Sequence, residues 1–269
     1  MFQLYKPILK SIPNFRDLGG IENHDKFRIK KNTIYRSEAL VELTNQDKEI
    51  LDKLNIKNVL DFRLEHEVLE HPSYLINGSK YINISPIAPY ASIAAENPDS
   101  NLKNSNKEVA LLKYLENPSE AMESQMRQLV KDETSIQTFK FLLDMLLDVK
   151  NLPLVFHCRG GKDRAGYATI LILLILDVEL SVIEEDYLFT NEVNNERNAL
   201  KLRKYSEKNQ DEKFLELRRQ LMLAKKSYFD VTLSEMAEIS GSVENYIEDV
   251  LKIDKNKKER IKKNLLENY

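Results

Sequence analysis

Three of the seven glycines in this 269-residue chain fall within ten residues, between a short apolar segment and a longer one. The short segment, Leu152–His157, has the length and composition of a strand buried in a parallel sheet. The longer one, Ala168–Leu176, is typical of a core helix and is about half as long as a membrane span. Glycines allow the chain between them to turn tightly. A strand, a glycine-rich loop and a helix in this order favour an α/β fold.

The loop between these segments is suited to bind an anion, since N–H groups can turn inward at the start of a helix whose dipole favours negative charge. Cys158 begins the loop and Arg164 ends it, so the sulfur and the guanidinium can face the same anion. The inward N–H groups, the helix dipole and Arg164 all favour a thiolate, which is the nucleophilic form. Arg164 can also hold two phosphoryl oxygens by parallel hydrogen bonds. This spacing indicates phosphoryl transfer.

The loop resembles the Cys-x5-Arg signature of cysteine-dependent phosphatases. More narrowly, it resembles bacterial tyrosine phosphatases whose loop reads His-Cys-x-x-Gly-Lys-Asp-Arg-(Thr/Ala)-Gly, with Ala165 at the position that is often threonine. Other segments are similar to that group as well, and they are Asn14–Gly20, Tyr35–Ser37, Asp61–Arg63 and Gly241–Val243. The resemblance covers nearly the whole chain apart from a polar stretch at about 91–134, and one domain over 1–269 is expected. The implied fold is a mostly parallel central sheet flanked by helices, with a helical or mobile lid insertion.

The resemblance implies a metal-independent phosphomonoester hydrolase, a protein-tyrosine phosphatase that acts through a phosphocysteine intermediate. Its partners would be phosphotyrosine proteins, while dual specificity and phosphoinositide phosphatase activity stay open as additions. No cofactor is expected, and His24, His66 and His71 lack metal-ligand spacing. Two rival interpretations are a silent phosphate-binding module and an arsenate reductase or sulfur transferase. A pure binder does not need the thiolate, and arsenate reduction commonly needs further cysteines, which this chain lacks.

The resemblance also implies roles for individual residues. Cys158 is the expected nucleophile and Arg164 the expected ligand of the phosphoryl group. Asp163 is the first candidate for the general acid and Asp61, at a strand end, is the second. The further residues expected to bind phosphate are Arg159, Gly160, Gly161, Lys162, Ala165 and Gly166. Lys162 is expected at the mouth of the pocket, where positive charge in similar enzymes goes with acceptance of phosphoinositides.

Five residues are expected to support the site, and they are His157, Asp61, Arg63, Arg16 and Asp17. His157 ends the strand and is expected to orient the loop by hydrogen bonding rather than to act as a base. Arg16 and Asp17 either tie the Gly19-Gly20 turn to the site or form a purely structural ion pair.

Elsewhere the chain alternates between strand and helix patterns. Short β-rich segments occur at 33–37, 59–63 and 81–84, and a capped helix is predicted to begin at Thr44. A polar stretch at about 91–134 is predicted to be a mobile insertion with some helix near Leu111 and Met122. It is either a lid over the site or a surface loop without a role. The lysine-rich tail, 255–263, is predicted to be a solvated, fraying helix.

Composition narrows the partners and the compartment. The formal net charge of −3 disfavours nucleic acid, which binds basic surfaces. No segment is apolar for long enough to predict integral membrane association. The N-terminus lacks the apolar stretch of a secretory leader, so a cytoplasmic protein, or one exported without a cleavable leader, is expected. A single cysteine excludes an intramolecular disulfide.

Overall fold

The apolar segment before the glycine loop forms the middle strand of a five-stranded sheet. The computed structural model describes residues 7–88, 117–207 and 212–268. The strand order is β1-β3-β6-β4-β5, with β1 antiparallel to β3 and the other pairs parallel. These strands are Arg16–Asp17 (β1), Ile34–Ser37 (β3), Asn58–Asp61 (β4), Lys80–Asn83 (β5) and Leu154–His157 (β6). A second, antiparallel pair joins Arg28–Ile29 (β2) to Leu266–Glu267 (β7).

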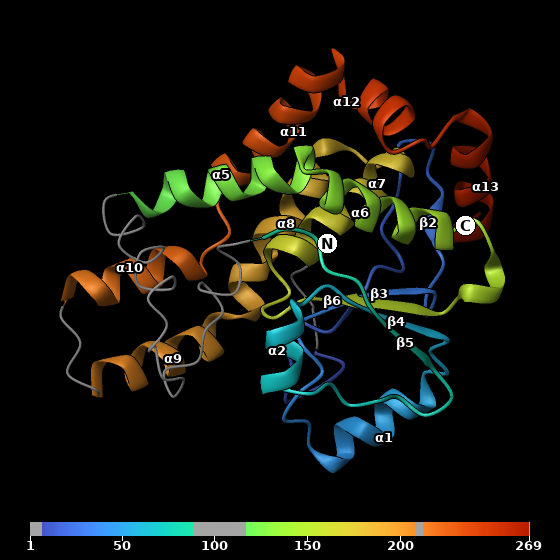
Figure 1. Cartoon of the computed structure of the whole chain (residues 1–269). Helices are drawn as coiled ribbons and strands as arrows, with labels where there is room; N and C mark the ends of the chain where they lie inside the picture. The colour runs from blue at the N-terminus through green and yellow to red at the C-terminus, as the bar shows by residue number, and fades with distance from the viewer. Residues whose placement is uncertain (1–6, 89–116, 208–211, 269) are drawn as a thin grey trace.

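Helices cover both faces of the sheet, with α1 on one side and α6 and α7 on the other (Figure 1). In chain order the α-helices are Asn45–Lys53 (α1), Glu65–Glu70 (α2), Pro118–Lys131 (α5), Glu133–Met145 (α6), Asp163–Ile175 (α7), Leu180–Val193 (α8), Asn195–Glu207 (α9), Glu212–Met222 (α10), Lys226–Ser240 (α11), Val243–Asn245 (α12) and Lys255–Leu265 (α13). A 3-10 turn spans Val149–Asn151 (η2), and a π-helical turn spans Tyr246–Val250 (η3). The mostly parallel α/β architecture predicted from the sequence is confirmed.

The alternation of side chains along the strands divides the core into two apolar clusters. Tyr35, Val59 and Val155 point toward α1, while Leu60 and Phe156 belong to the larger cluster around α7. Ser37 of β3, His157 of β6 and Asp61 of β4 are direct neighbours in the register. The segments that follow these three strands therefore leave the sheet side by side at its carboxyl edge.

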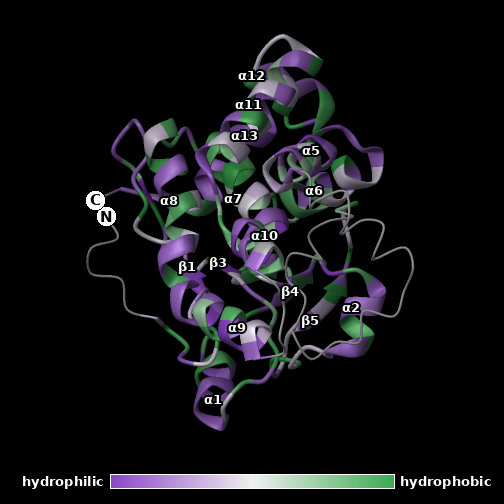
Figure 2. Cartoon of the chain, turned by 90° about the vertical axis from the view of Figure 1, so that its left-hand side faces the viewer, coloured by the Kyte–Doolittle hydropathy of each residue, from purple (hydrophilic) through white to green (hydrophobic). Residues whose placement is uncertain are grey.

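The helix after the loop, α7, lies at the centre of the molecule. All of its residues except Leu174 are buried. Because an apolar helix without a polar face must be surrounded by protein, α7 is held rigidly between the sheet and the surrounding helices. By contrast, α9 and α10 lie side by side away from the sheet, and their mixed hydropathy is visible in Figure 2.

The predicted insertion at 91–134 needs a correction in its second half. Its first part, including Leu111, lies outside the described residues. The segment Pro118–Lys131 is the helix α5, capped by Asn117, and its residues Met122, Met126 and Leu129 are fully buried. Helix α5 packs against α11, so this part belongs to the core and is not a mobile insertion. The helix predicted near Met122 is therefore present.

The prediction of a fraying C-terminal helix is also wrong. Helix α13 buries Ile261 and Leu265 completely. Lys258 and Lys262 both form ion pairs with Asp177, with nitrogen–oxygen distances of 2.5 Å in each case. The sequence showed the lysines but not the buried stripe between them, and this stripe fixes the helix to the rest of the fold.

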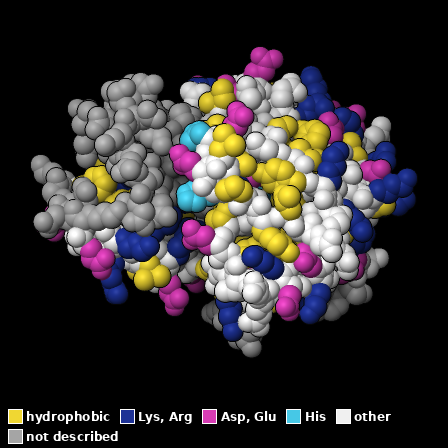
Figure 3. Space-filling model, turned by 60° about the horizontal axis from the view of Figure 1, so that its bottom comes forward, with side chains coloured by type: hydrophobic (Ala, Val, Ile, Leu, Met, Phe, Trp, Pro, Cys, Tyr) yellow, Lys and Arg dark blue, Asp and Glu magenta, His cyan; other side chains and the backbone are white. Residues whose placement is uncertain are grey.

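The surface seen in Figure 3 carries basic and acidic side chains interspersed with apolar ones. Among the described helices, none combines the length and the apolar character that a membrane span requires.

Candidate active site

The loop from Cys158 to Lys162 joins the end of β6 to the start of α7, as the sequence predicts. Its tightest point is Gly161, whose φ is +66°. A Cβ atom there would lie 2.5 Å from the Asn14 amide nitrogen and 2.8 Å from the Glu38 main-chain nitrogen. Only glycine fits this combination of left-handed backbone and close approach.

The carbonyl groups of the loop are fixed by four donor residues from three other segments. The carbonyl of Arg159 accepts from Ala39 N (3.2 Å). The carbonyl of Gly160 accepts from Asn14 Nδ2 (3.2 Å) and from Asn194 Nδ2 (3.4 Å). The carbonyl of Gly161 accepts from Arg36 Nη2 (2.8 Å). Within the described residues, the main-chain N–H groups of 159–162 have no acceptor. With the carbonyls bonded to their surroundings, these N–H groups are left available for an anion.

Arg164 lies in the first turn of α7 and is completely buried. Its Nη1 donates to Glu67 Oε2 (2.7 Å) and to Phe62 O (2.9 Å), and its Nη2 donates to Glu67 Oε1 (3.2 Å). Burial alone would lower the pKa of Arg164. The Glu67 carboxylate and the Cys158 sulfur outweigh this effect and raise the pKa above its usual value. The Nε group is buried and lacks an acceptor among the described residues. It is a donor left for a ligand.

Glu67 was missed by the sequence analysis. It is the third residue of α2, where its carboxylate also accepts from Leu64 N (2.9 Å). Burial alone would raise the pKa of Glu67, but Arg164 lowers it below its usual value. An acidic residue in the first turn of a helix is a common capping feature, so nothing in the sequence pattern distinguishes Glu67 as a partner of the loop arginine.

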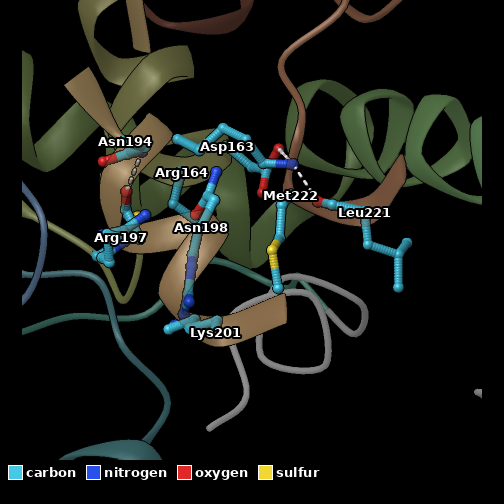
Figure 4. A pocket seen from close by; sticks show the side chains of 11 residues that line it. Asp163, Arg164, Asn194, Arg197, Asn198, Lys201, Leu221 and Met222 are labelled. Atoms are coloured by element: carbon cyan, nitrogen blue, oxygen red, sulfur yellow. Dashed lines mark hydrogen bonds and ion pairs between the residues drawn. The ribbon is translucent and has the colours of Figure 1, made fainter. Parts of the chain in front are cut away.

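A cavity opens in front of the loop and is lined by Cys158, Gly160, Lys162, Asp163 and Arg164. Its other side comes from α9 and from the end of α10 (Figure 4). The residues on that side are Asn194, Arg197, Asn198, Lys201, Leu221 and Met222. We refer to this space as the reactive cavity. Cys158 is only 2% exposed, so the cavity is narrow at its base.

The two candidate acids differ in their surroundings. Asp163 begins α7 and shares the reactive cavity with Cys158. Asp61 does not line the reactive cavity, and its carboxylate accepts from Arg63 Nη2 (2.7 Å) and Tyr81 OH (2.7 Å). Although burial favours the neutral form, the neighbouring His157 together with Arg63 and Tyr81 holds the pKa of Asp61 far below its usual range. A carboxylate kept ionised in this way is a poor proton donor.

Arg63 and His157 belong to this same buried network. Arg63 also donates to His71 O (2.7 Å) and Ser73 Oγ (2.7 Å), so it ties two loops together. His157 Nδ1 lies 3.5 Å from Asp61 Oδ1 and 3.4 Å from Cys158 O. Burial lowers the pKa of His157, and the nearby Asp61 opposes this shift. The position of His157 beside the start of the loop fits the expected orienting role.

The expected position of Lys162 at the mouth of the pocket needs a correction. Its side chain is 6% exposed, and Nζ donates to Leu221 O (2.6 Å) and Leu223 O (3.0 Å) at the end of α10. Nζ also lies 3.5 Å from Asp163 Oδ1. Burial lowers the pKa of Lys162. The ammonium therefore connects the loop to α10 and is not open to solvent.

Arg16 and Asp17 have separate partners. Asp17 accepts from Gly19 N (2.8 Å) and Asn32 N (2.8 Å), so it shapes the Gly19-Gly20 turn alone. Arg16 Nη1 donates to Asp186 Oδ1 (2.8 Å). The same carboxylate pairs with Arg36, which holds the carbonyl of Gly161. Arg16 thus reaches the loop through Asp186 and Arg36, two residues to which the sequence analysis gave no role.

The last two expected loop residues lie in the first turn of α7. Ala165 is fully buried. A Cβ atom on Gly166 would lie 3.0 Å from the ring of Tyr187, so glycine permits this close packing. Across the described part of the chain, no group of three or more His, Cys, Asp or Glu residues could hold a metal ion.

Comparisons with known proteins give the family. Residues 7–267 match the model of a family described as the tyrosine phosphatase family. The "Putative tyrosine-protein phosphatase H16_A0669" of Cupriavidus necator is 27% identical over 244 residues, covering 91% of this chain and 83% of that protein. The "Triple specificity protein phosphatase PtpB" of Mycobacterium tuberculosis is 24% identical over 199 residues, covering 66% of this chain and 67% of that protein. The chain therefore belongs to the tyrosine phosphatase family.

Proposed function

We propose that this protein hydrolyses phosphotyrosine through a phosphocysteine intermediate and without a metal ion. One observation carries the proposal: Cys158, Gly160, Lys162 and Arg164 line one cavity, and among the described residues Arg164 Nε and the main-chain N–H groups of the loop have no acceptor. A phosphoryl group there has donors for its oxygens and a sulfur for attack on phosphorus.

In the first step, the Cys158 thiolate attacks phosphorus while the bond from phosphorus to the tyrosyl oxygen breaks. Asp163 gives its proton to that oxygen, so tyrosine leaves as the neutral phenol. In the second step, water attacks phosphorus, Asp163 takes a proton from the water, and the sulfur–phosphorus bond breaks. Inorganic phosphate and the thiolate are released. Arg164 and the loop N–H groups follow the charge on the phosphoryl oxygens in both steps.

Phosphotyrosine is the substrate that the family membership supports. The name of the mycobacterial relative indicates broader specificity in that protein. For this chain, acceptance of phosphoserine, phosphothreonine and phosphoinositides is a further expectation. Lys162 gives it no support, because its ammonium is bonded to main-chain carbonyls. Assays of phosphopeptides and soluble phosphoinositides side by side would decide it.

The proposal is tested by measuring hydrolysis of an aryl phosphate in the presence of a metal chelator. We expect turnover that Cys158→Ser abolishes, while binding of inorganic phosphate is largely retained because the loop N–H groups and Arg164 remain. Absence of turnover in the parent protein, with phosphopeptide binding intact, would assign a binding module instead. Loss of turnover on chelation would contradict the metal-independent route.

A further inference from the structure

A second cavity adjoins the reactive cavity, and Arg197 and Lys201 of α9 line both. We refer to it as the flanking cavity. Its remaining cations are Arg159, from the loop itself, and Lys204. Apolar side chains of Ile12, Val41 and Leu200 complete much of its wall.

The two arginines of the flanking cavity are held close to the phosphate loop. Arg159 follows the nucleophile directly, and its Nη1 is buried without an acceptor in the described ranges. Arg197 lies against the loop, with Nη2 3.8 Å from where a Cβ on Gly160 would be. Its Nη1 pairs with Glu38, while its Nε is buried and has no acceptor within the described structure. Both side chains keep donors that an anion could use.

The flanking cavity carries excess positive charge in a protein whose net charge is negative. Among the described residues that line it are four basic side chains, Arg159, Arg197, Lys201 and Lys204, and two carboxylates, Glu38 and Glu42. His71 also lines it, and burial together with Arg159 lowers the pKa of that ring, so it adds no charge at neutral pH.

Lys201 is affected by this crowding. Burial is the main reason why the pKa of Lys201 falls to about 7. The positive charges of Arg197, Arg159 and Arg218 lower it further, and Glu38 opposes the shift only partly. Clustered cations of this kind are stabilised when an anion binds among them.

We propose that the flanking cavity binds an acidic side chain next to the phosphotyrosine of a peptide substrate. This inference rests on the proposed function and names the sequence context that the enzyme prefers. Arg159, Arg197 and Lys201 would hold the carboxylate, while the phosphotyrosine occupies the reactive cavity beside them.

A peptide fits this arrangement better than an inositol headgroup does. Ile12, Val41 and Leu200 offer apolar contacts to the stem of a glutamate and to neighbouring side chains, and Leu200 is 58% exposed. An inositol ring brings only hydroxyl and phosphate groups to that wall. Because apolar walls beside placed charges are typical of side-chain recognition, the observations favour a peptide.

The test measures both kcat/KM on the parent protein and fluorescence anisotropy on Cys158→Ser, which binds without turnover. Three phosphotyrosine peptides are compared, identical except for glutamate, glutamine or lysine beside the phosphotyrosine. We expect about a tenfold preference for glutamate over glutamine, and a disadvantage for lysine. Because half-exposed charges are screened by salt, the preference should shrink as ionic strength rises.

The variants Arg159→Gln and Lys201→Gln should each reduce the glutamate preference, and together they should bring it close to one. Lys263→Gln on α13 removes an exposed lysine that lines neither cavity, so it should leave the preference unchanged. The ratio between peptides is internally normalised, so a general loss of activity does not affect it.

Equal affinity for the three peptides, or a preference that survives in the double variant, would overturn the inference. Because anisotropy needs no turnover, it tests the flanking cavity even if the proposed chemistry fails. The binding of a soluble inositol bisphosphate should be measured in the same variants. If that binding depended on Arg159 and Lys201 more strongly than peptide binding does, the cavity would be assigned to a headgroup and the inference would also be overturned.

Discussion

At the scale of single residues, the charge of Arg164 depends on a carboxylate from another element. Arg164 is completely buried, and a buried guanidinium without a counter-charge is strongly unfavourable. Glu67 supplies that charge through two nitrogen–oxygen contacts, of 2.7 and 3.2 Å. This pairing fixes the plane of the guanidinium and leaves Nε unoccupied. Glu67 is thus a positioning residue for the proposed chemistry.

Glu67→Gln should therefore reduce both activity and stability. We expect a loss of roughly 3 kcal/mol in the free energy of unfolding, since removal of one partner leaves a buried charge. We expect kcat to fall by at least about tenfold, with a smaller change in KM, because a displaced guanidinium affects the transition state most. Urea unfolding and steady-state kinetics measure the two effects.

Glu65→Gln is the matched control, because Glu65 is exposed on the same short helix. It should leave both quantities nearly unchanged. If Glu67→Gln lowered stability but left kcat intact, the carboxylate would have only a structural role.

The two aspartates give a second prediction. Asp163→Asn should slow hydrolysis of aryl phosphates with poor leaving groups far more than that of esters with good ones, because only the former need a proton from the enzyme. The measurement is the slope of log kcat against leaving-group pKa.

Asp61→Asn should give a different result. It should destabilise the fold, since Arg63 loses its buried partner, while the slope against leaving-group pKa stays that of the parent. A slope that changed in Asp61→Asn and not in Asp163→Asn would exchange the two assignments.

Residue identities near the nucleophile could be predicted because they are contiguous in the chain and carry a known spacing. Glu67, Asp186 and Asn14 could not, since each contributes one hydrogen-bonding group from a distant segment. Lys162 shows the opposite case. Its place in the loop was clear, but the direction of a long flexible side chain depends on which carbonyls lie nearby.

At the scale of elements, Lys162 joins the phosphate loop to the end of α10. Its ammonium donates to two carbonyls that a helix leaves unbonded at its C-terminus. Among the described residues, α10 has contacts with α9 and α5 and lies away from the sheet. This single side chain therefore contributes much of the connection between α10 and the loop.

Lys162→Met should loosen α10 without unfolding the core. The substitution keeps the apolar stem and removes the donor, so the carbonyls of Leu221 and Leu223 lose their partner. We expect hydrogen exchange of the amides in 212–222 to accelerate by about tenfold, while amides of α7 stay protected. Lys150→Met, at an exposed position in η2, is the control and should change neither. Unchanged exchange in α10 would show that the contact contributes little.

Elements with a strong apolar pattern were predicted well, and amphipathic ones were not. The strands β3, β4 and β6 occur close to the predicted positions because their buried runs stand out from the flanking residues. The half-buried β5 was predicted from its alternation of apolar and polar residues. Helices α5 and α13 were taken for mobile or solvated segments. Each carries many charged and polar residues, and only a narrow stripe is buried, such as Met122, Met126 and Leu129 in α5.

At the scale of the whole molecule, the site is held together by buried ion pairs, and those of Glu67 and Asp186 join distant segments. Asp61 with Arg63, Glu67 with Arg164, and Asp186 with Arg16 and Arg36 are all nearly inaccessible to water. The sequence predicted that the loop lies between a buried strand and a core helix. It could not predict this network, because pairing is decided by the packing of helices that come from three different parts of the chain.

This network predicts how stability depends on pH. Burial alone would raise the pKa values of Asp61 and Glu67. His157 and Arg63 lower the pKa of Asp61 below its usual value, and Arg164 does the same for Glu67. In the unfolded chain these carboxyls take up protons near pH 4, whereas in the folded protein they do so only at lower pH. Their stabilising effect is therefore complete above about pH 5 and is lost as pH falls.

We expect the free energy of unfolding, measured with urea, to fall between about pH 5 and pH 3. The slope of this free energy against pH should be shallower in Asp61→Asn, because one fewer carboxyl binds a proton on unfolding. Asp17 has the opposite effect, because burial raises its pKa. This residue reduces the dependence of the free energy of unfolding on pH but does not reverse its sign. A control variant at an exposed acidic residue, Glu65→Gln, should keep the parent slope. A free energy that stayed constant or rose over this range would mean that the buried pairs do not retain their charges in the folded protein.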